Sequence, residues 1–266
     1  MTARRDVRVA DNRFEVGLFA PKPQPSSPMV MLTAQSLLEL KLLLRNGEQL
    51  LLTMFIPITL LVGLTLLPLG AMGTEPVNQV VPAVMMVAVM STAFTGQAIA
   101  VGFDRRYGAL KRLGATPLPK WGIIGGKAAA VLLVVVLQSV VLGSIGLALG
   151  WRPAPAGLLL GAVVIALGTV TFATMGLLLG GTLRAEIVLA LANILWFVML
   201  GVGSLVVLAE ELPTALHTIA RVVPSGALAE ALGQAVTGSL DWFGIAVLTG
   251  WALLCGWLAV RTFRFT

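Results

Sequence analysis

The sequence predicts an all-α integral membrane protein, and its composition and apolar runs carry that prediction. Of the 266 residues, 58% are hydrophobic and only 11% are charged, with a mean hydropathy of +0.95. A soluble domain carries about 25% charged residues, so this composition excludes an ordinary water-soluble domain. The single cysteine, Cys255, excludes an internal disulfide framework, a cysteine-based zinc site and an iron–sulfur cluster.

Six apolar stretches are long enough to cross a bilayer. A helix needs about 20 apolar residues to span roughly 30 Å of hydrocarbon. The predicted spans cover residues 50–69, 80–103, 122–149, 157–181, 187–209 and 242–260. These runs do not alternate and are too long for barrel strands, and a helix pairs its own backbone groups within lipid. We therefore expect a six-helix transmembrane domain over residues 49–266, with Pro57 and Pro82 kinking or breaking the first two spans.

The distribution of Lys and Arg predicts the orientation. All but two of the 18 basic residues fall on one side of the six spans, the exceptions being Arg152 and Arg221. The acidic residues divide more evenly, so the bias belongs to the basic residues alone. Because basic residues stay on the cytoplasmic side, both termini are expected in the cytoplasm.

Two segments precede the first span. Residues 1–28 are charged and then proline-rich, without the apolar core of a signal peptide, and are expected to form a disordered cytoplasmic tail. Residues 29–48 are expected to form an amphipathic interfacial helix, because Leu37, Leu40 and Leu44 form a stripe and Gln35 and Glu39 lie opposite. The alternative is an N-terminal extension of the first span.

The connection before the last span is the longest on the outer side. Pro213 and Pro224 are typical helix-start signals, so two short external helices are expected within residues 212–238, at about 213–222 and 225–236. Their apolar residues suggest that they dip into the outer membrane interface. Whether they gate release of a substrate stays open.

The predicted spans hold almost no ionisable side chain. Proton-coupled carriers rely on buried carboxylates or histidines, so a proton relay is disfavoured. The only histidine, His217, is expected outside the membrane. Residues 122–127 superficially resemble a phosphate-binding loop, but Trp121 and Ala128 stand where that loop needs Gly and Ser or Thr. We expect no catalytic residue, no metal site and no nucleotide site in this chain.

A few mildly polar residues remain inside the spans. One interpretation is hydrogen bonding between helices. The functional interpretation is the lining of a substrate path, for which the candidates are Thr53, Thr92, Thr95, Gln97 and Asn193.

The cytoplasmic loop after the second span carries the most specific pattern. Leu110 and Leu113, spaced i and i+3 among basic residues, give a short helix an apolar face that fits a groove on a cytoplasmic partner. A solvated anchor is the alternative. The order Asp104-Arg105-Arg106, Gly108, Leu110, Leu113, Thr116-Pro117 and Gly126-Lys127 resembles the corresponding loop of ABC-2 type transporter permease subunits, the group that includes bacterial daunorubicin-type drug and antibiotic exporters. Ala109 replaces the usual Thr, and Asp104 replaces the common Glu.

The resemblance implies an ABC-2 (type V exporter-like) permease fold and a transport subunit rather than an enzyme. Two copies of a separate ATPase subunit would bind ATP and Mg, and a second permease chain would complete a homodimer or heterodimer. Residues 104–117 would be the coupling helix that contacts the ATPase, and its contact residues would be Asp104, Arg105, Arg106, Tyr107, Gly108, Leu110, Lys111, Arg112, Leu113, Thr116 and Pro117. The turn 182–186 and the helix before the first span would add contacts.

The same resemblance implies a location and a task. The chain would lie in a bacterial-type inner (plasma) membrane and, without any nucleic-acid partner, move a hydrophobic or amphipathic drug, antibiotic or lipid out of the cytoplasm or inner leaflet. The substrate would pass between the two permease chains, along spans one, two and five. The alternative function is a membrane assembly or structural protein without transport activity.

Overall fold

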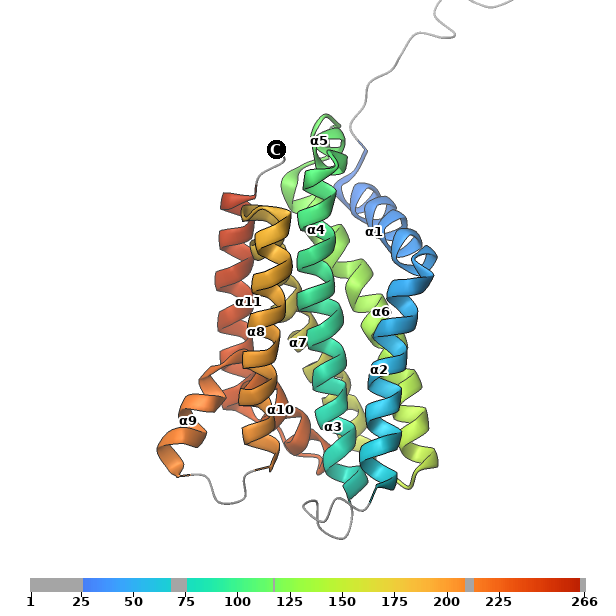
Figure 1. The fold of residues 1–266 in the computed structure, drawn as a ribbon, viewed down its shortest axis with the longest axis vertical. Helices are drawn as coiled ribbons and strands as arrows, with labels where there is room; N and C mark the ends of the chain where they lie inside the picture. The colour runs from blue at the N-terminus through green and yellow to red at the C-terminus, as the bar shows by residue number, and fades with distance from the viewer. Residues whose placement is uncertain (1–25, 68–75, 117, 209–212, 264–266) are drawn as a thin grey trace, which may run out of the picture.

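The computed structural model describes residues 26–67, 76–116, 118–208 and 213–263, and every regular element in these ranges is helical. The long helices run side by side in one bundle (Figure 1). They are α2 (Gly47–Leu66), the continuous series α3 (Pro76–Val89), η1 (Met90–Gly96) and α4 (Gln97–Arg106), then α6 (Lys120–Ala148), α7 (Pro155–Thr182), α8 (Ala185–Leu208) and α11 (Trp242–Thr262). The all-α membrane architecture predicted from the sequence is confirmed.

Five of these helices are long and apolar enough to cross a membrane. They cover Val77–Arg106, Lys120–Ala148, Pro155–Thr182, Ala185–Val207 and Trp242–Thr262. The apolar part of α2, Thr53–Leu66, is shorter than such a span. A crossing by α2, and with it the count of six, therefore stays a prediction.

Small residues let α7 approach the centre of the bundle. A Cβ atom added at Gly176 would lie 2.7 Å from the Phe94 carbonyl oxygen, and one added at Gly180 would lie 2.4 Å from the Ala98 carbonyl oxygen. Both distances are shorter than van der Waals contact. Glycine at these two positions therefore allows backbone-to-backbone packing of α7 on η1 and α4, as is common between membrane helices.

The main irregularity in the continuous series α3, η1 and α4 is η1, a π-helical segment. Pro57 and Pro82 both lie inside continuous helices, so of the kink or break expected from the sequence neither proline produces a break. The backbone instead widens at Met90–Gly96, where Met90, Thr92 and Phe94 are buried. π-helical turns are rare and occur often at functional sites.

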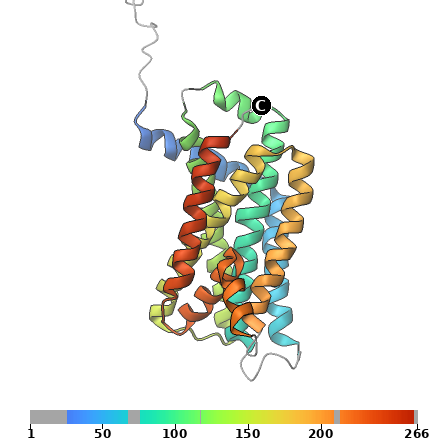
Figure 2. The ribbon, with the colours of Figure 1, turned by 90° about the vertical axis from the view of Figure 1, so that its left-hand side faces the viewer.

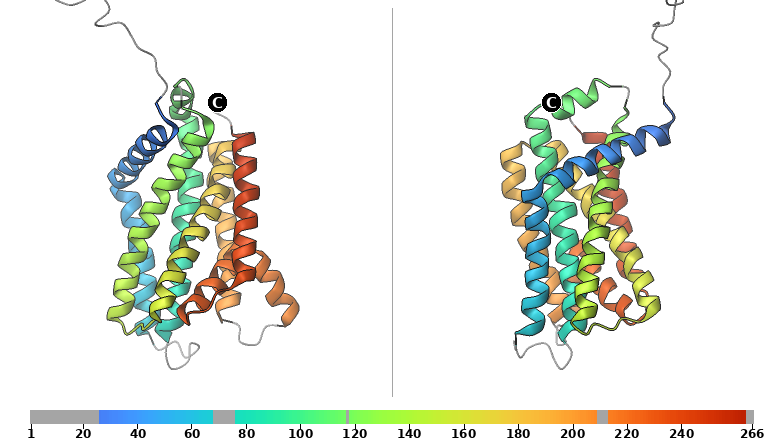
Figure 3. Two further views of the ribbon diagram at one scale, coloured as in Figure 1. Left: turned by 180° about the vertical axis from the view of Figure 1, so that it is seen from behind. Right: turned by 90° about the vertical axis from the view of Figure 1, so that its right-hand side faces the viewer.

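Helix α1 (Pro28–Arg45), helix α5 (Ala109–Gly114) and the last turn of α11 lie at one end of the bundle (Figures 1 and 3). Helix α1 ends at Arg45, and Asn46 separates it from α2, so α1 is a separate helix rather than an extension of α2. In the right-hand view of Figure 3, α1 crosses this end obliquely. Its Leu37 and Leu44 are exposed, whereas Gln35 and Glu39 are buried. The polar side of α1 thus faces the bundle.

The opposite end holds α9 (Thr214–Val222) and α10 (Pro224–Val236), close to the two short helices predicted there. Leu216 and Ile219 of α9 are exposed, as expected of an interfacial helix. By contrast, α10 turns back into the bundle and packs on α3, α7, α8 and α11 (Figure 2). Its Ala227 and Leu228 are fully buried, so α10 is part of the core rather than a surface helix.

Candidate functional site

A buried ion cluster joins three helices at the end of the bundle that carries α5. The Lys127 ammonium of α6 lies 2.8 Å from Glu39 Oε2 of α1 and 2.8 Å from Asp104 Oδ2 of α4. The Gln35 amide donates a 2.8 Å hydrogen bond to the other oxygen of Glu39. The Lys127 side chain is only 5% exposed and that of Glu39 only 9%, so these charges depend on one another.

The packing of α1 on α6 explains how the cluster forms. A Cβ atom at Gly126 would lie 2.5 Å from the Gln35 side chain, so only glycine lets α1 come this close. A buried ammonium without a partner costs several kcal/mol, and here two carboxylates compensate it. The Gly126-Lys127 pair therefore fixes the position of α1 relative to α4 and α6.

The two arginines after Asp104 reach other helices. Arg105 donates to the carbonyl oxygens of Gly181 and Leu183, where α7 ends. Arg106 lies 2.6 Å from Glu186 at the start of α8, in an exposed pair. Successive helical residues point about 100° apart, so three consecutive charged residues can engage three different helices. The end of α4 is thereby tied to α6, α7 and α8, and through Lys127 to α1.

The predicted coupling helix 104–117 is not one continuous helix. Its first residues are the last turn of α4, and the chain then turns at Tyr107 and Gly108 before α5 begins. Gly108 has a φ of +74°, a left-handed conformation that glycine adopts without the penalty of a side chain. Only the six residues of α5 form a separate helix, and Pro117 lies outside the described residues.

The expectation that Leu110 enters a groove on a partner needs correction. Leu110 is fully buried in the chain itself, in a cluster with Val101, Ile123, Leu177 and Phe263. Leu113 is half-buried against the same cluster. The apolar face of α5 is thus covered by the ends of α4, α6, α7 and α11.

The outward side of this segment is basic and aromatic. Tyr107 is 70% exposed, and Lys111, Arg112 and Thr116 are exposed as well. A cleft of about 610 Å³ lies nearby, lined by Gly102, Arg105, Arg106 and residues 182–187. The surface available to a partner therefore consists of the basic side of α5 and the α7–α8 turn.

The structure brings together only some of the predicted path residues. Thr92 of η1 donates to Gln138 Oε1 of α6 at 3.0 Å, and Gln138 donates to the Thr53 carbonyl oxygen of α2 at 3.0 Å. Thr95 Oγ1 and Gln97 Nε2 are buried without a hydrogen-bond partner among the described residues. Asn193 does not join these residues. Its side chain is exposed on α8 and donates to the Leu189 carbonyl oxygen of its own helix.

Sequence reasoning missed the ion cluster. Glu39 was assigned to the polar side of a surface helix, and Lys127 to a motif at the start of a span. The available signal was a lysine within the glycine-rich, apolar start of a span, because such a lysine needs a carboxylate partner. Within the described ranges, no three His, Cys, Asp or Glu side chains could together hold a metal ion.

Comparison with known families agrees with this architecture. A model of the family described as ABC-2 family transporter protein matches residues 73–261. That range extends from the start of α3 to the end of α11 and includes α5, Asp104 and Lys127. No curated protein matches the chain. Since the family match covers well over half of the sequence, the chain belongs to the ABC-2 family of transporter proteins.

Proposed function

We propose that this permease is the membrane half of an ATP-driven exporter in a bacterial-type inner membrane. A separate ATPase subunit, in two copies, would bind ATP and Mg and hydrolyse the nucleotide. The observation that carries the proposal is the exposed basic side of α5, which is packed on the end of the bundle through the buried Leu110. Lys111 and Arg112 face outward while Leu110 anchors the helix from below.

The anchoring of α5 gives a physical route for coupling. A force on α5 acts through Leu110 on the ends of α4, α6, α7 and α11. A displacement of α4 would then reach α6 through the Asp104–Lys127 ion pair and the α7–α8 turn through Arg105. The π-helical segment η1 directly precedes α4 in the continuous helical series, and it is the proposed point at which that series bends.

The charge of the exposed side of α5 supports a contact between this side and the ATPase subunit. The exposed residues of the segment are basic, so an acidic groove on the ATPase subunit would complement them. Such complementarity speeds association and fixes the orientation of the complex. The exposed Arg106–Glu186 pair beside the cleft would form the rim of that contact.

The substrate path is proposed between two permease chains, along α2, the α3–η1–α4 rod and α8. Phe55 of α2 and Phe197 of α8 are both more than half exposed. Asn193 on α8 is a polar group on an otherwise apolar outer face, which suits a path or a chain–chain contact better than lipid. Thr53, Thr92, Thr95 and Gln97 would line deeper parts of this path, for a hydrophobic or amphipathic drug, antibiotic or lipid.

Vesicles containing the chain and its ATPase subunit test this proposal. Movement of a lipophilic fluorescent drug should require ATP and should survive an uncoupler that collapses the proton gradient. A variant of the ATPase subunit that binds ATP without hydrolysing it is the control. Movement driven by a proton gradient without ATP would reject the mechanism, and failure of any ATPase subunit to co-purify would favour an assembly or structural role.

A further inference from the structure

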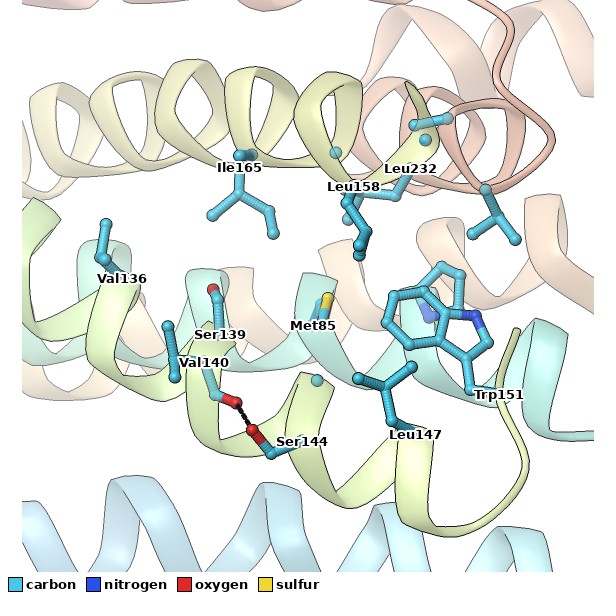
Figure 4. Close-up of a pocket in the computed structure, with 17 residues that line it drawn as sticks. Met85, Val136, Ser139, Val140, Ser144, Leu147, Trp151, Leu158, Ile165 and Leu232 are labelled. Atoms are coloured by element: carbon cyan, nitrogen blue, oxygen red, sulfur yellow. Dashed lines mark hydrogen bonds between the residues drawn. The ribbon is translucent and has the colours of Figure 1, made fainter. Parts of the chain in front are cut away.

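A second region of the bundle has the features of a ligand site, far from α5. A cavity of about 320 Å³ lies between α3, α6, α7 and α10, toward the opposite end of the bundle (Figure 4). Met85, Ile165 and Leu232 form part of its wall. Val140 and Leu158 also line it and are 61% and 48% exposed, so the cavity opens sideways toward the surrounding bilayer.

The interior of this cavity offers almost no hydrogen bonds. Its two serines donate to carbonyl oxygens of their own helix. Ser139 donates to Val135 at 2.8 Å. Ser144 donates to Val140 at 2.7 Å, the bond drawn in Figure 4. The hydroxyl hydrogens are therefore not available to a ligand. An occupant must be apolar, and in a bilayer the abundant apolar group of this kind is an acyl chain.

A cleft of about 720 Å³, whose lining is mixed but includes several polar side chains, adjoins the apolar cavity. The two share Pro82 and Val236 as lining residues. The cleft is lined by Gln79, Gln234 and Thr237, among others, and by Arg152. The combination of an apolar cavity and a polar cleft has the two-part chemistry of an amphiphile.

Arg152 gives the cleft its preference for an anion. One of its terminal nitrogens donates to the carbonyl oxygens of Leu147 and Trp151, at 2.9 and 3.0 Å, which holds the side chain in place. No described carboxylate lies within 4.0 Å of Arg152. Glu230, the acidic residue that lines the cleft, instead accepts from Gln234 and lies 3.7 Å from His217. The remaining guanidinium N–H groups suit the oxygens of a phosphate.

Trp151 connects the lining of the apolar cavity to Arg152 along the chain. Its ring lines the apolar cavity beside Leu147 (Figure 4), and it directly precedes Arg152 in the chain. Its indole nitrogen is buried and has no hydrogen-bond partner among the described residues. The nitrogen is enclosed by protein atoms, so a ligand in the cavity meets the apolar ring of Trp151 rather than its N–H group.

We propose that these two spaces form one binding site for a membrane phospholipid. The acyl chain occupies the cavity between α6 and α7, and the phosphate lies in the cleft on Arg152. The site belongs to a single chain rather than to the space between two chains, although its cleft is also lined by Pro82 of α3 and Val206 of α8, two of the helices proposed for the path. It therefore goes beyond the proposed transport function, and the bound lipid would hold α10 against α6 and α7.

Glycine positions allow a clean test. A Cβ atom at Gly161, which lines the cavity, meets no atom within 4 Å, so Gly161→Leu fills the space without a clash. Gly250 of α11 is equally open but lines neither space, and Gly250→Leu is the matched control. Arg152→Gln removes the cation, and Arg152→Lys keeps it.

The measurement is native mass spectrometry of the full, purified chain titrated with phosphatidylglycerol and, separately, with diacylglycerol of the same acyl chains. We expect one phosphatidylglycerol per chain to bind well before further copies. Gly161→Leu should abolish this step, and Arg152→Gln should weaken it roughly tenfold, the value of a charge-assisted hydrogen bond. Gly250→Leu should bind as the unmodified chain does, and Arg152→Lys should retain most of the affinity.

Two results would overturn the proposal. One is unchanged phosphatidylglycerol binding in Gly161→Leu, with helicity and monodispersity equal to those of the control. The other is equal binding of diacylglycerol, which lacks the phosphate. If Gly161→Leu does not fold, Ala162→Phe gives the same decision, because Ala162 is exposed on α7 at the mouth of the cavity.

Discussion

Lys127 illustrates how one side chain can define the geometry of a membrane protein end. Its ammonium bridges a carboxylate on α1 and a carboxylate on α4, while its own backbone belongs to α6. These two ion pairs position the three helices, and the pair with Glu39 is shielded from water. Asp104 is 38% exposed and keeps part of its hydration, whereas Glu39 has little. Loss of the Lys127 charge should therefore cost more free energy at Glu39 than at Asp104.

Replacing Lys127 with methionine should destabilise the chain by roughly 3 kcal/mol, because it leaves the Glu39 carboxylate buried without a cation. Unfolding in detergent, followed by circular dichroism, measures this loss. Lys111→Met is the control, since Lys111 is exposed on α5 and should change stability little. The double variant Lys127→Met, Glu39→Gln should recover part of the loss. Equal stability of Lys127→Met and Lys111→Met would show that the cluster does not hold α1.

At the scale of elements, apolar runs predict the long helices, and the helix-start signals Pro213 and Pro224 predict the two short helices near residues 213–236. The details that depend on neighbours are different. The burial of α10 and the π-helical turn at η1 follow from packing that no local pattern records. The division of residues 104–117 depends on a left-handed Gly108, which a glycine permits but does not require. Leu110 and Leu113 predict an apolar face correctly, yet spacing cannot say whether the chain itself or a partner covers that face.

Helix α5 permits a test of partner binding that leaves the fold intact. Lys111→Glu combined with Arg112→Glu should weaken association with the ATPase subunit by at least about tenfold, because it reverses the charge of the exposed side. The loss should be greatest at low salt, where electrostatic attraction is least screened. Co-purification and affinity measurements at two salt concentrations provide the readout.

The matched control for the α5 test is Arg261→Glu, which reverses the charge of an exposed basic residue in the last turn of α11. It should leave association nearly unchanged. By contrast, Leu110→Asp should unfold this end of the bundle by placing a carboxylate in an apolar cluster, so it cannot report on the partner alone. Unchanged affinity of the double α5 variant, with normal helicity, would refute the assignment of α5 as the ATPase contact.

At the scale of the whole molecule, the basic residues are distributed unevenly between the two ends of the bundle. The basic residues Arg105, Lys111 and Lys127 lie near α1 and α5, whereas Arg152 and Arg221 lie near α9 and α10 (Figure 1). From the positive-inside rule we expect the end with α5 to face the cytoplasm. The proposed ATPase contact and the proposed phospholipid site then belong to opposite membrane surfaces. The first must meet a cytoplasmic protein, and the second must meet lipids of the outer leaflet.

Cysteine labelling tests this orientation, because the natural Cys255 is buried within α11 and should react slowly with a membrane-impermeant maleimide. Tyr107→Cys and Ser239→Cys introduce exposed thiols at the two ends of the bundle. In intact cells, Ser239→Cys should be labelled and Tyr107→Cys should not, and permeabilisation should make both reactive. The unmodified chain reports background from Cys255. Labelling of Tyr107→Cys in intact cells while Ser239→Cys stays protected would invert the molecule, placing α5 out of reach of any cytoplasmic ATPase and removing the physical basis of the coupling proposal.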